Sequence, residues 1–194
     1  MVLGVGDSAT TDGGAGALEA LDEAGVRPSI DVVCDVRAPF EDAPRVFAPQ
    51  KGADEAQVKS LRERLDRLAR KLPKDPRGEP MTGAAGGLAG GLWAGAGAKL
   101  HPGAAYVLDA VGFDERMRAS GFVVTGEGAL DEQTLTGKCV AEVATRSRQG
   151  GVACHAVVGV ARLEPFQARI LDLASVTEAG TENELRAAGE ALAR

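Results

Sequence analysis

The segment 125–138 holds two carboxylates and a lysine among several glycines, directly after an apolar run. Phosphoryl transfer needs these residue types, because glycines let the backbone approach phosphates, carboxylates hold a metal and a lysine neutralises phosphate charge. Glycines flank Glu127, so we expect its carboxylate on an exposed loop. A helix cap at Asp131 and Thr134 would explain one acid and one hydroxyl, but it would leave Glu127 and Lys138 unexplained.

A second polar segment, residues 4–16, lies between an apolar run and a helical pattern. In α/β proteins, ligands bind at the carboxyl ends of strands, beside the positive ends of helices. Gly13 and Gly14 would leave backbone N–H groups open to phosphate oxygens, and Ser8 and Thr10 would add hydroxyl donors. The segment therefore predicts an anion site.

Asp12 lies among these donors. A carboxylate beside a phosphate needs a cation or a proton between them, which predicts Mg²⁺ or a general base. The alternative is that Asp12 and the hydroxyls merely cap a tight strand–helix turn. The segment fits neither the P-loop nor the dinucleotide pattern, since no lysine follows its glycines.

Two further segments are candidates for the same site. Asp35 ends an apolar run, where active-site carboxylates are common, and Gln50 and Lys51 belong to a polar turn before a helical pattern. The glycine-rich stretch 83–92 fits close helix packing. Its functional alternative is a helix N-terminus opened by residues 82–87, which could hold a carboxylate or phosphate.

The composition excludes several classes of protein. The 194 residues are 44% hydrophobic and 26% charged, as in an ordinary protein of one domain or two small ones. A formal net charge of −6 argues against nucleic acid as a main partner, because such binders need a surplus of Lys and Arg. No run approaches the ~18 apolar residues of a membrane span. Three widely spaced cysteines favour the cytoplasm over a disulfide framework.

The pattern of apolar and polar residues predicts strands alternating with helices, and hence an α/β fold with mostly parallel sheets. The expected strands are 1–6, 30–36, 121–125, 152–158 and 174–176. The expected helices are 15–24, 54–72, 82–98, 104–111, 164–171 and 182–194, with a further helix that ends near residue 149.

Taken together, four ordered segments resemble the glycerate kinase family. Residues 7–14 match its Gly-Gly-Ser-x-Thr-x-Asp-Gly-Gly pattern, and 34–36 with 48–53 match Cys-Asp-Val followed by Gly-Pro-Gln-Lys-Gly-Ala. Residues 83–87 match Gly-Ala-Ala-Gly-Gly, and 125–138 match Thr-Gly-Glu-Gly-x-x-Asp-x-Gln-Ser/Thr-x-x-Gly-Lys. Such a series is far more specific than one glycine loop.

Three positions depart from the family pattern. Asp7 stands where glycine is usual, Thr11 where asparagine is common and Thr136 where histidine is frequent. A carboxylate at Asp7 would repel a bound phosphate unless it turns away or helps to bind metal.

The resemblance implies an ATP- and Mg²⁺-dependent kinase that phosphorylates a hydroxyl of D-glycerate and gives phosphoglycerate. It implies two partial α/β lobes, 1–115 and 116–194, with a cleft between them and the family's N-terminal segment absent. We expect the two acidic turns to face each other across that cleft. The implied catalytic residues are Asp12, Glu127, Asp131 and Lys138, with Glu127 and Asp131 as metal ligands. The implied substrate and phosphate ligands are Ser8, Thr10, Gly13, Gly14, Asp35, Gln50, Lys51, Gly86, Gly87, Gly126, Gln133 and Thr134.

Two other classes of function stay open. Without the N-terminal segment, an apolar sheet edge would be uncovered, which favours a catalytically silent binding module or a homodimer. A dinucleotide-dependent oxidoreductase is disfavoured, because no Gly-x-Gly-x-x-Gly loop precedes an acidic residue at the right distance. The choice between the 2- and 3-hydroxyl of glycerate also stays open.

Overall fold

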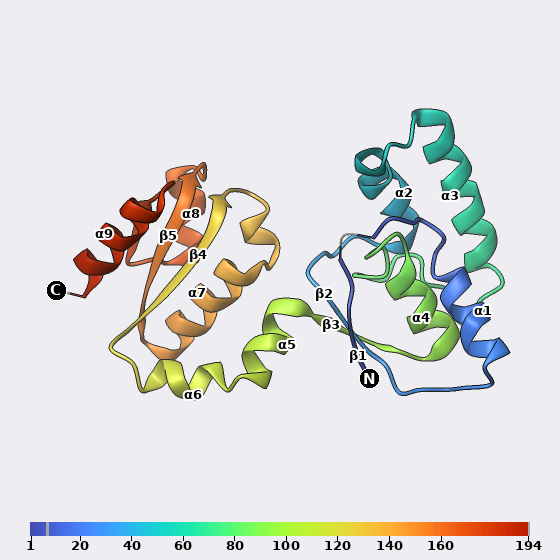
Figure 1. Ribbon diagram of the computed structural model, residues 1–194, viewed down its shortest axis with the longest axis horizontal. Coiled ribbons are helices and arrows are strands. Elements are labelled where there is room, and N and C mark those ends of the chain that lie inside the picture. Colours follow the sequence, from blue (N-terminus) through green and yellow to red (C-terminus); the bar gives the residue numbers. More distant parts are fainter. Residues whose placement is uncertain (7, 194) are drawn as a thin grey trace. The chain divides into compact units, whose positions relative to one another are not determined.

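The computed structural model describes residues 1–6 and 8–193 and divides into two compact units, 1–103 and 104–194 (Figure 1). Each unit contains a parallel three-stranded sheet, with strand orders β1-β2-β3 and β4-β5-β6, and helices packed around it. The expected α/β class with parallel sheets is confirmed. Residues 104–115, which were expected to belong to the first lobe, are grouped with the second unit.

The first unit is built on a short sheet whose middle strand is its most buried. Strand β2 (Asp31–Cys34) lies between β1 (Val2–Gly4) and β3 (Lys99–Pro102). Val32 of β2 is fully buried and packs in a core with Ile30 and Leu92. Strand β3 was not expected from the sequence, because it is only four residues long and three of them are polar or proline. The helices of this unit are α1 (Ala15–Glu23), α2 (Ala43–Phe47), α3 (Glu55–Ala69) and α4 (Leu88–Ala96).

The glycine-rich stretch forms a shorter helix than the sequence predicts. Helix α4 begins at Leu88, because Gly86 and Gly87 have φ values of 67° and 89°, in the left-handed region that a regular helix excludes. Because glycine has no side chain, the backbone of this stretch can approach the backbone of the loop after β1 closely. A Cβ atom on Gly86 would overlap the carbonyl oxygen of Thr10, and one on Gly91 would overlap that of Gly13. Close packing therefore explains the later glycines of this stretch.

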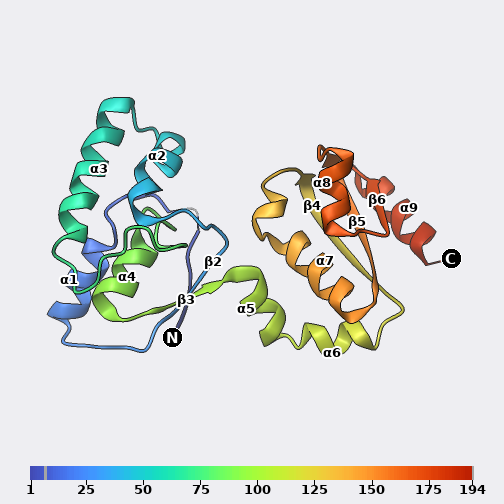
Figure 2. The ribbon, with the colours of Figure 1, turned by 180° about the vertical axis from the view of Figure 1, so that it is seen from behind.

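The second unit has longer strands. Helix α7 (Cys139–Gly150) covers one face of β4 (Phe122–Leu130) and β5 (Ala153–Ala161), while β6 (Ser175–Glu178) is seen best from behind (Figures 1 and 2). Val140 of α7 and Ala156 and Val158 of β5 are almost completely buried in the core between them. The other helices of this unit are α5 (Gly103–Ala110), α6 (Phe113–Arg118), α8 (Pro165–Leu171) and α9 (Glu182–Leu192).

Strand β4 corrects one expectation about the site. It continues through residues 126–130, so Glu127 belongs to a strand and is half-buried, where an exposed loop was expected. The reason lies in the neighbouring strand, which is equally long and pairs with β4 as far as Leu130. A Cβ atom on Gly126 would overlap the carbonyl oxygen of Val157, so this glycine serves close strand pairing. No helix of the described residues is long and apolar enough to cross a membrane.

A single arginine joins three helices of the second unit. The guanidinium of Arg146 on α7 donates to Asp109 of α5 at 2.5 Å, to Glu142 at 2.8 Å, to Asp114 of α6 at 3.3 Å and to the carbonyl oxygen of Ala105 at 3.3 Å. Its side chain is only 13% exposed, and these carboxylates raise its pKa further above the ordinary value. Arg146 therefore joins α5 and α6 to α7.

Replacing Arg146 with methionine is expected to lower the free energy of unfolding of this unit by about 2 kcal/mol, because three carboxylates would lose a shared cation. The matched control is Arg186→Met, which removes an exposed ion pair with Glu182 on α9 and should change stability by less than about 0.5 kcal/mol. Urea unfolding followed by circular dichroism measures both. Equal effects of the two substitutions would contradict this role of Arg146.

Candidate functional site

Lysine 51 brings two distant segments together in the first unit. Its ammonium donates to the hydroxyl of Ser8 at 2.8 Å and to the carbonyl oxygen of Thr10 at 2.7 Å. Ser8 and Thr10 belong to the loop after β1, and Lys51 ends a 3₁₀ turn that follows α2. Burial lowers the pKa of Lys51. Three predicted ligands thus lie together, while Asp7 lies outside the described residues.

The next residues of the same loop already form hydrogen bonds within the protein through the Asp12 carboxylate and backbone N–H groups. The two carboxylate oxygens of Asp12 accept the backbone N–H groups of Gly14 and Gly16, each at 3.1 Å, which caps the start of α1. The N–H of Gly13 donates to the carbonyl oxygen of Gly86 at 3.0 Å. The N–H groups of Gly13 and Gly14 therefore do not stand open, contrary to the expectation for a phosphate cradle. Gly86 and Gly87 are buried behind this loop.

The remaining predicted residues of this unit lie at the surface. Asp35 follows β2 directly and is exposed, and Gln50 is exposed in the 3₁₀ turn that contains Lys51. The neighbouring Cys34 is buried. Burial raises the pKa of its thiol to about 11, and the charge of Asp35 acts in the same direction. The thiol of Cys34 is therefore protonated and unreactive near neutral pH.

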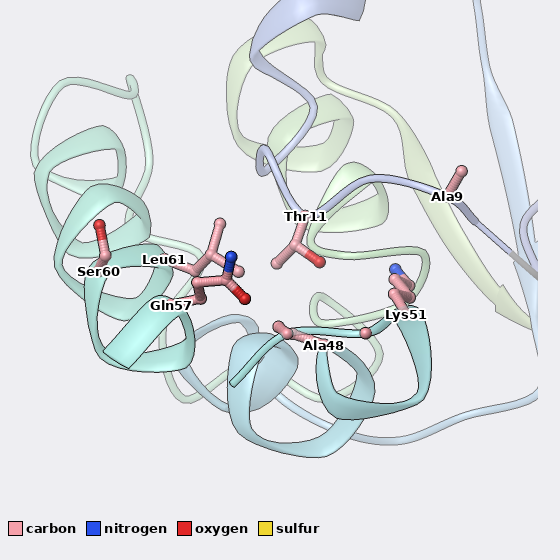
Figure 3. A pocket seen from close by; sticks show the side chains of 9 residues that line it. Ala9, Thr11, Ala48, Lys51, Gln57, Ser60 and Leu61 are labelled. Atoms are coloured by element: carbon pink, nitrogen blue, oxygen red, sulfur yellow. The ribbon is translucent and has the colours of Figure 1, made fainter. Parts of the chain in front are cut away.

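A pocket of about 420 Å³ opens beside Lys51 (Figure 3). Gln57 and Ser60 line this pocket from the first turns of α3, and neither was predicted as a site residue from the sequence. Gln57 occupies the third position of a capping box with Asp54, and that pattern can be recognised in the sequence as the start of a helix but not as a pocket wall. The lining residues are Ala9, Thr11, Ala48, Lys51, Gly52, Ala53, Gln57, Ser60 and Leu61.

The turn after β4 gathers five of the predicted residues of the second unit. The fully buried hydroxyl of Thr134 donates to Glu127 Oε1 at 2.5 Å, which ties the turn to the strand. The backbone N–H of Gln133 donates to Asp131 Oδ1 at 2.9 Å, and Lys138 Nζ donates to the side-chain oxygen of Gln133 at 3.0 Å. The carboxylate of Glu127 in β4 thus lies beside a turn that carries a second carboxylate, an amide and an ammonium, at the carboxyl end of a strand, where α/β proteins bind ligands.

The carboxylates of Glu127 and Asp131 are candidate ligands for a magnesium ion. The described residues contain no cluster of three or more histidine, cysteine or acidic side chains. Mg²⁺ does not require such a cage, because it is usually held by one or two carboxylates together with water and substrate phosphates. In these hydrogen bonds Glu127 and Asp131 each use one carboxylate oxygen, so the donor set fits the ion. That the turns of the two units face each other stays a prediction.

Comparisons with known proteins point in one direction. A sequence model of the Glycerate kinase family matches residues 22–190. The chain is 37% identical over 196 residues to a glycerate kinase of Halalkalibacterium halodurans, which covers 82% of this chain and 52% of that protein. It is 33% identical over 186 residues to the glycerate 2-kinase of Escherichia coli, with 77% and 49% covered.

A solved structure agrees with these sequences. The crystal structure of a candidate glycerate kinase 2 from Salmonella typhimurium LT2 aligns with a TM-score of 0.71 and 30% identity, over 97% of this chain and 60% of that one. The chain spans about half the length of the curated relatives that it matches.

Proposed function

Because this chain belongs to the glycerate kinase family, we propose that it carries out, or contributes to, ATP-dependent phosphoryl transfer to a hydroxyl of D-glycerate. The product would be phosphoglycerate. The observation that carries the proposal is the end of β4 with the turn that follows it, where Glu127 of the strand and Asp131 and Lys138 of the turn are held by hydrogen bonds through Thr134 and Gln133.

Phosphoryl transfer asks a protein mainly to position the reactants and to stabilise negative charge. Glu127 and Asp131 would hold Mg²⁺, which neutralises charge on the phosphates when it is bound. Lys138, whose ammonium is oriented by Gln133, would contact a phosphate oxygen. In the first unit Lys51 would neutralise a second anionic group.

The acceptor hydroxyl must also lose its proton. Three carboxylates were candidates for this role from the sequence. Both oxygens of Asp12 accept backbone N–H groups, so a reaction at Asp12 would disturb the cap of α1. We therefore assign the role of proton acceptor to Asp131 or Glu127. In each of them the hydrogen bonds described above use only one of the two carboxylate oxygens.

The direct test is ADP release by the full chain with ATP, Mg²⁺ and D-glycerate. We expect ADP to form only when glycerate is present, with glycerol as the control acceptor because it carries the hydroxyls without the carboxylate. ADP release at the same rate with and without glycerate would contradict the proposal. Calorimetry with ATP and with NADH separates a silent kinase module from a dinucleotide-binding protein.

A further inference from the structure

The pocket beside Lys51 contains a positive charge for which the described residues provide no acidic partner. Both partners of its ammonium, the Ser8 hydroxyl and the Thr10 carbonyl, are neutral oxygens, and the described part of the chain offers it no ion pair. An ammonium has three donors, and contacts with the described residues use two of them, which leaves the third for a ligand. A partly buried cation whose hydrogen-bond partners are neutral attracts an anion, because partial burial reduces the screening of their interaction by water.

The chemistry of the walls indicates which anion fits. Lys51 is the only charged side chain among the nine described lining residues, and most of the others are small or apolar. A single positive charge matches a carboxylate of charge −1. The triphosphate of a nucleotide carries several negative charges and requires more cations or a metal. The polar groups of Thr11 and Gln57 suit the hydroxyls of a small acid.

Gln57 is oriented before any ligand arrives. Its side-chain oxygen accepts the backbone N–H of Asp54 at 2.9 Å, and its own N–H donates to Asp54 Oδ1 at 2.7 Å. Because the oxygen is used by the helix cap, the amide NH₂ group is the part available to a ligand. Figure 3 shows this amide extending from α3 toward Thr11.

We propose that this pocket binds the carboxylate of the acceptor acid, with Lys51 as the countercharge and Gln57 as a second donor that sets specificity. The proposal deepens the function inferred above and rests on it. It places recognition of the acid in the first unit, which leaves the turn after β4 to the phosphates and metal. The pocket would also distinguish acids from neutral polyols, because only an acid carries a carboxylate that can pair with the Lys51 ammonium.

The test is Gln57→Glu in the full chain. Glutamate can also form a capping box with Asp54, so α3 should still begin at the same residue. The amide donor of Gln57 is replaced by a carboxylate, which repels the carboxylate of a bound acid. We expect the KM for D-glycerate to rise by about tenfold or more, with the KM for ATP unchanged. The matched control is Lys59→Gln, which changes the net charge of α3 by the same amount but lies outside the pocket lining. It should change neither KM by more than about twofold.

An unchanged KM for D-glycerate in Gln57→Glu would overturn this assignment and leave the kinase function intact. If the full chain turns over no glycerate, the proposed function fails, and direct calorimetry with D-glycerate and glycerol decides the pocket. Binding of glycerate but not glycerol, lost in Gln57→Glu, would still support a carboxylate site. Absence of glycerate binding together with absence of turnover would overturn both.

Discussion

Asp131→Asn is expected to lower kcat for D-glycerate by about 10²-fold or more, an effect typical of removing one preorganised electrostatic group from an active site. Asparagine keeps the side-chain oxygen that accepts the backbone N–H of Gln133, so the turn should stay folded. The negative charge that would hold Mg²⁺ or take the hydroxyl proton is lost. Lys138→Met should have a similar effect, because it removes the ammonium oriented by Gln133.

The neighbouring carboxylate provides the control. Glu132 is exposed, and its carboxylate accepts a hydrogen bond from Gln167 of α8. Glu132→Gln should therefore leave kcat within about twofold of the unsubstituted chain. Steady-state kinetics with circular dichroism on each variant separates catalysis from folding. Near-normal turnover in Asp131→Asn would remove this residue from the catalytic assignment.

Gly91→Ala is expected to destabilise the first unit by about 3 kcal/mol, the upper end of the usual overpacking cost. The added methyl group would overlap the backbone oxygen of Gly13, which cannot move aside as a flexible side chain could. The same carbonyl belongs to the loop that carries Ser8 and Thr10, so the ligands of Lys51 should shift as well. Urea unfolding and the KM for D-glycerate measure the two consequences.

Gly189→Ala is the matched control for this substitution. Gly189 also lies within a helix, α9, but a Cβ atom there would meet nothing within 4 Å. Alanine should therefore stabilise α9 by about 0.5–1 kcal/mol, because it forms helix more readily than glycine. If Gly91→Ala were as harmless as Gly189→Ala, the close approach of α4 to the loop after β1 would be wrong.

The sequence alone was sufficient for the family and for most of the helices and strands. Four segments contain the residue types of the family pattern in the same order. Residue type and order can be recognised without coordinates. Long elements such as α3 were also predictable, since its apolar residues recur at helical spacing and its cap is local. The short strand β3 carried no such periodic signal.

Only the tertiary structure decided what each glycine and carboxylate does. Asp12 caps α1, Glu127 lies in a strand, and Gly91 lets a helix touch a loop nearly eighty residues earlier in the chain. The pocket beside Lys51 likewise combines three segments that are separate in the sequence. Residue type and spacing determine local chemistry, whereas a hydrogen bond or a close approach depends on which distant backbone the fold brings near.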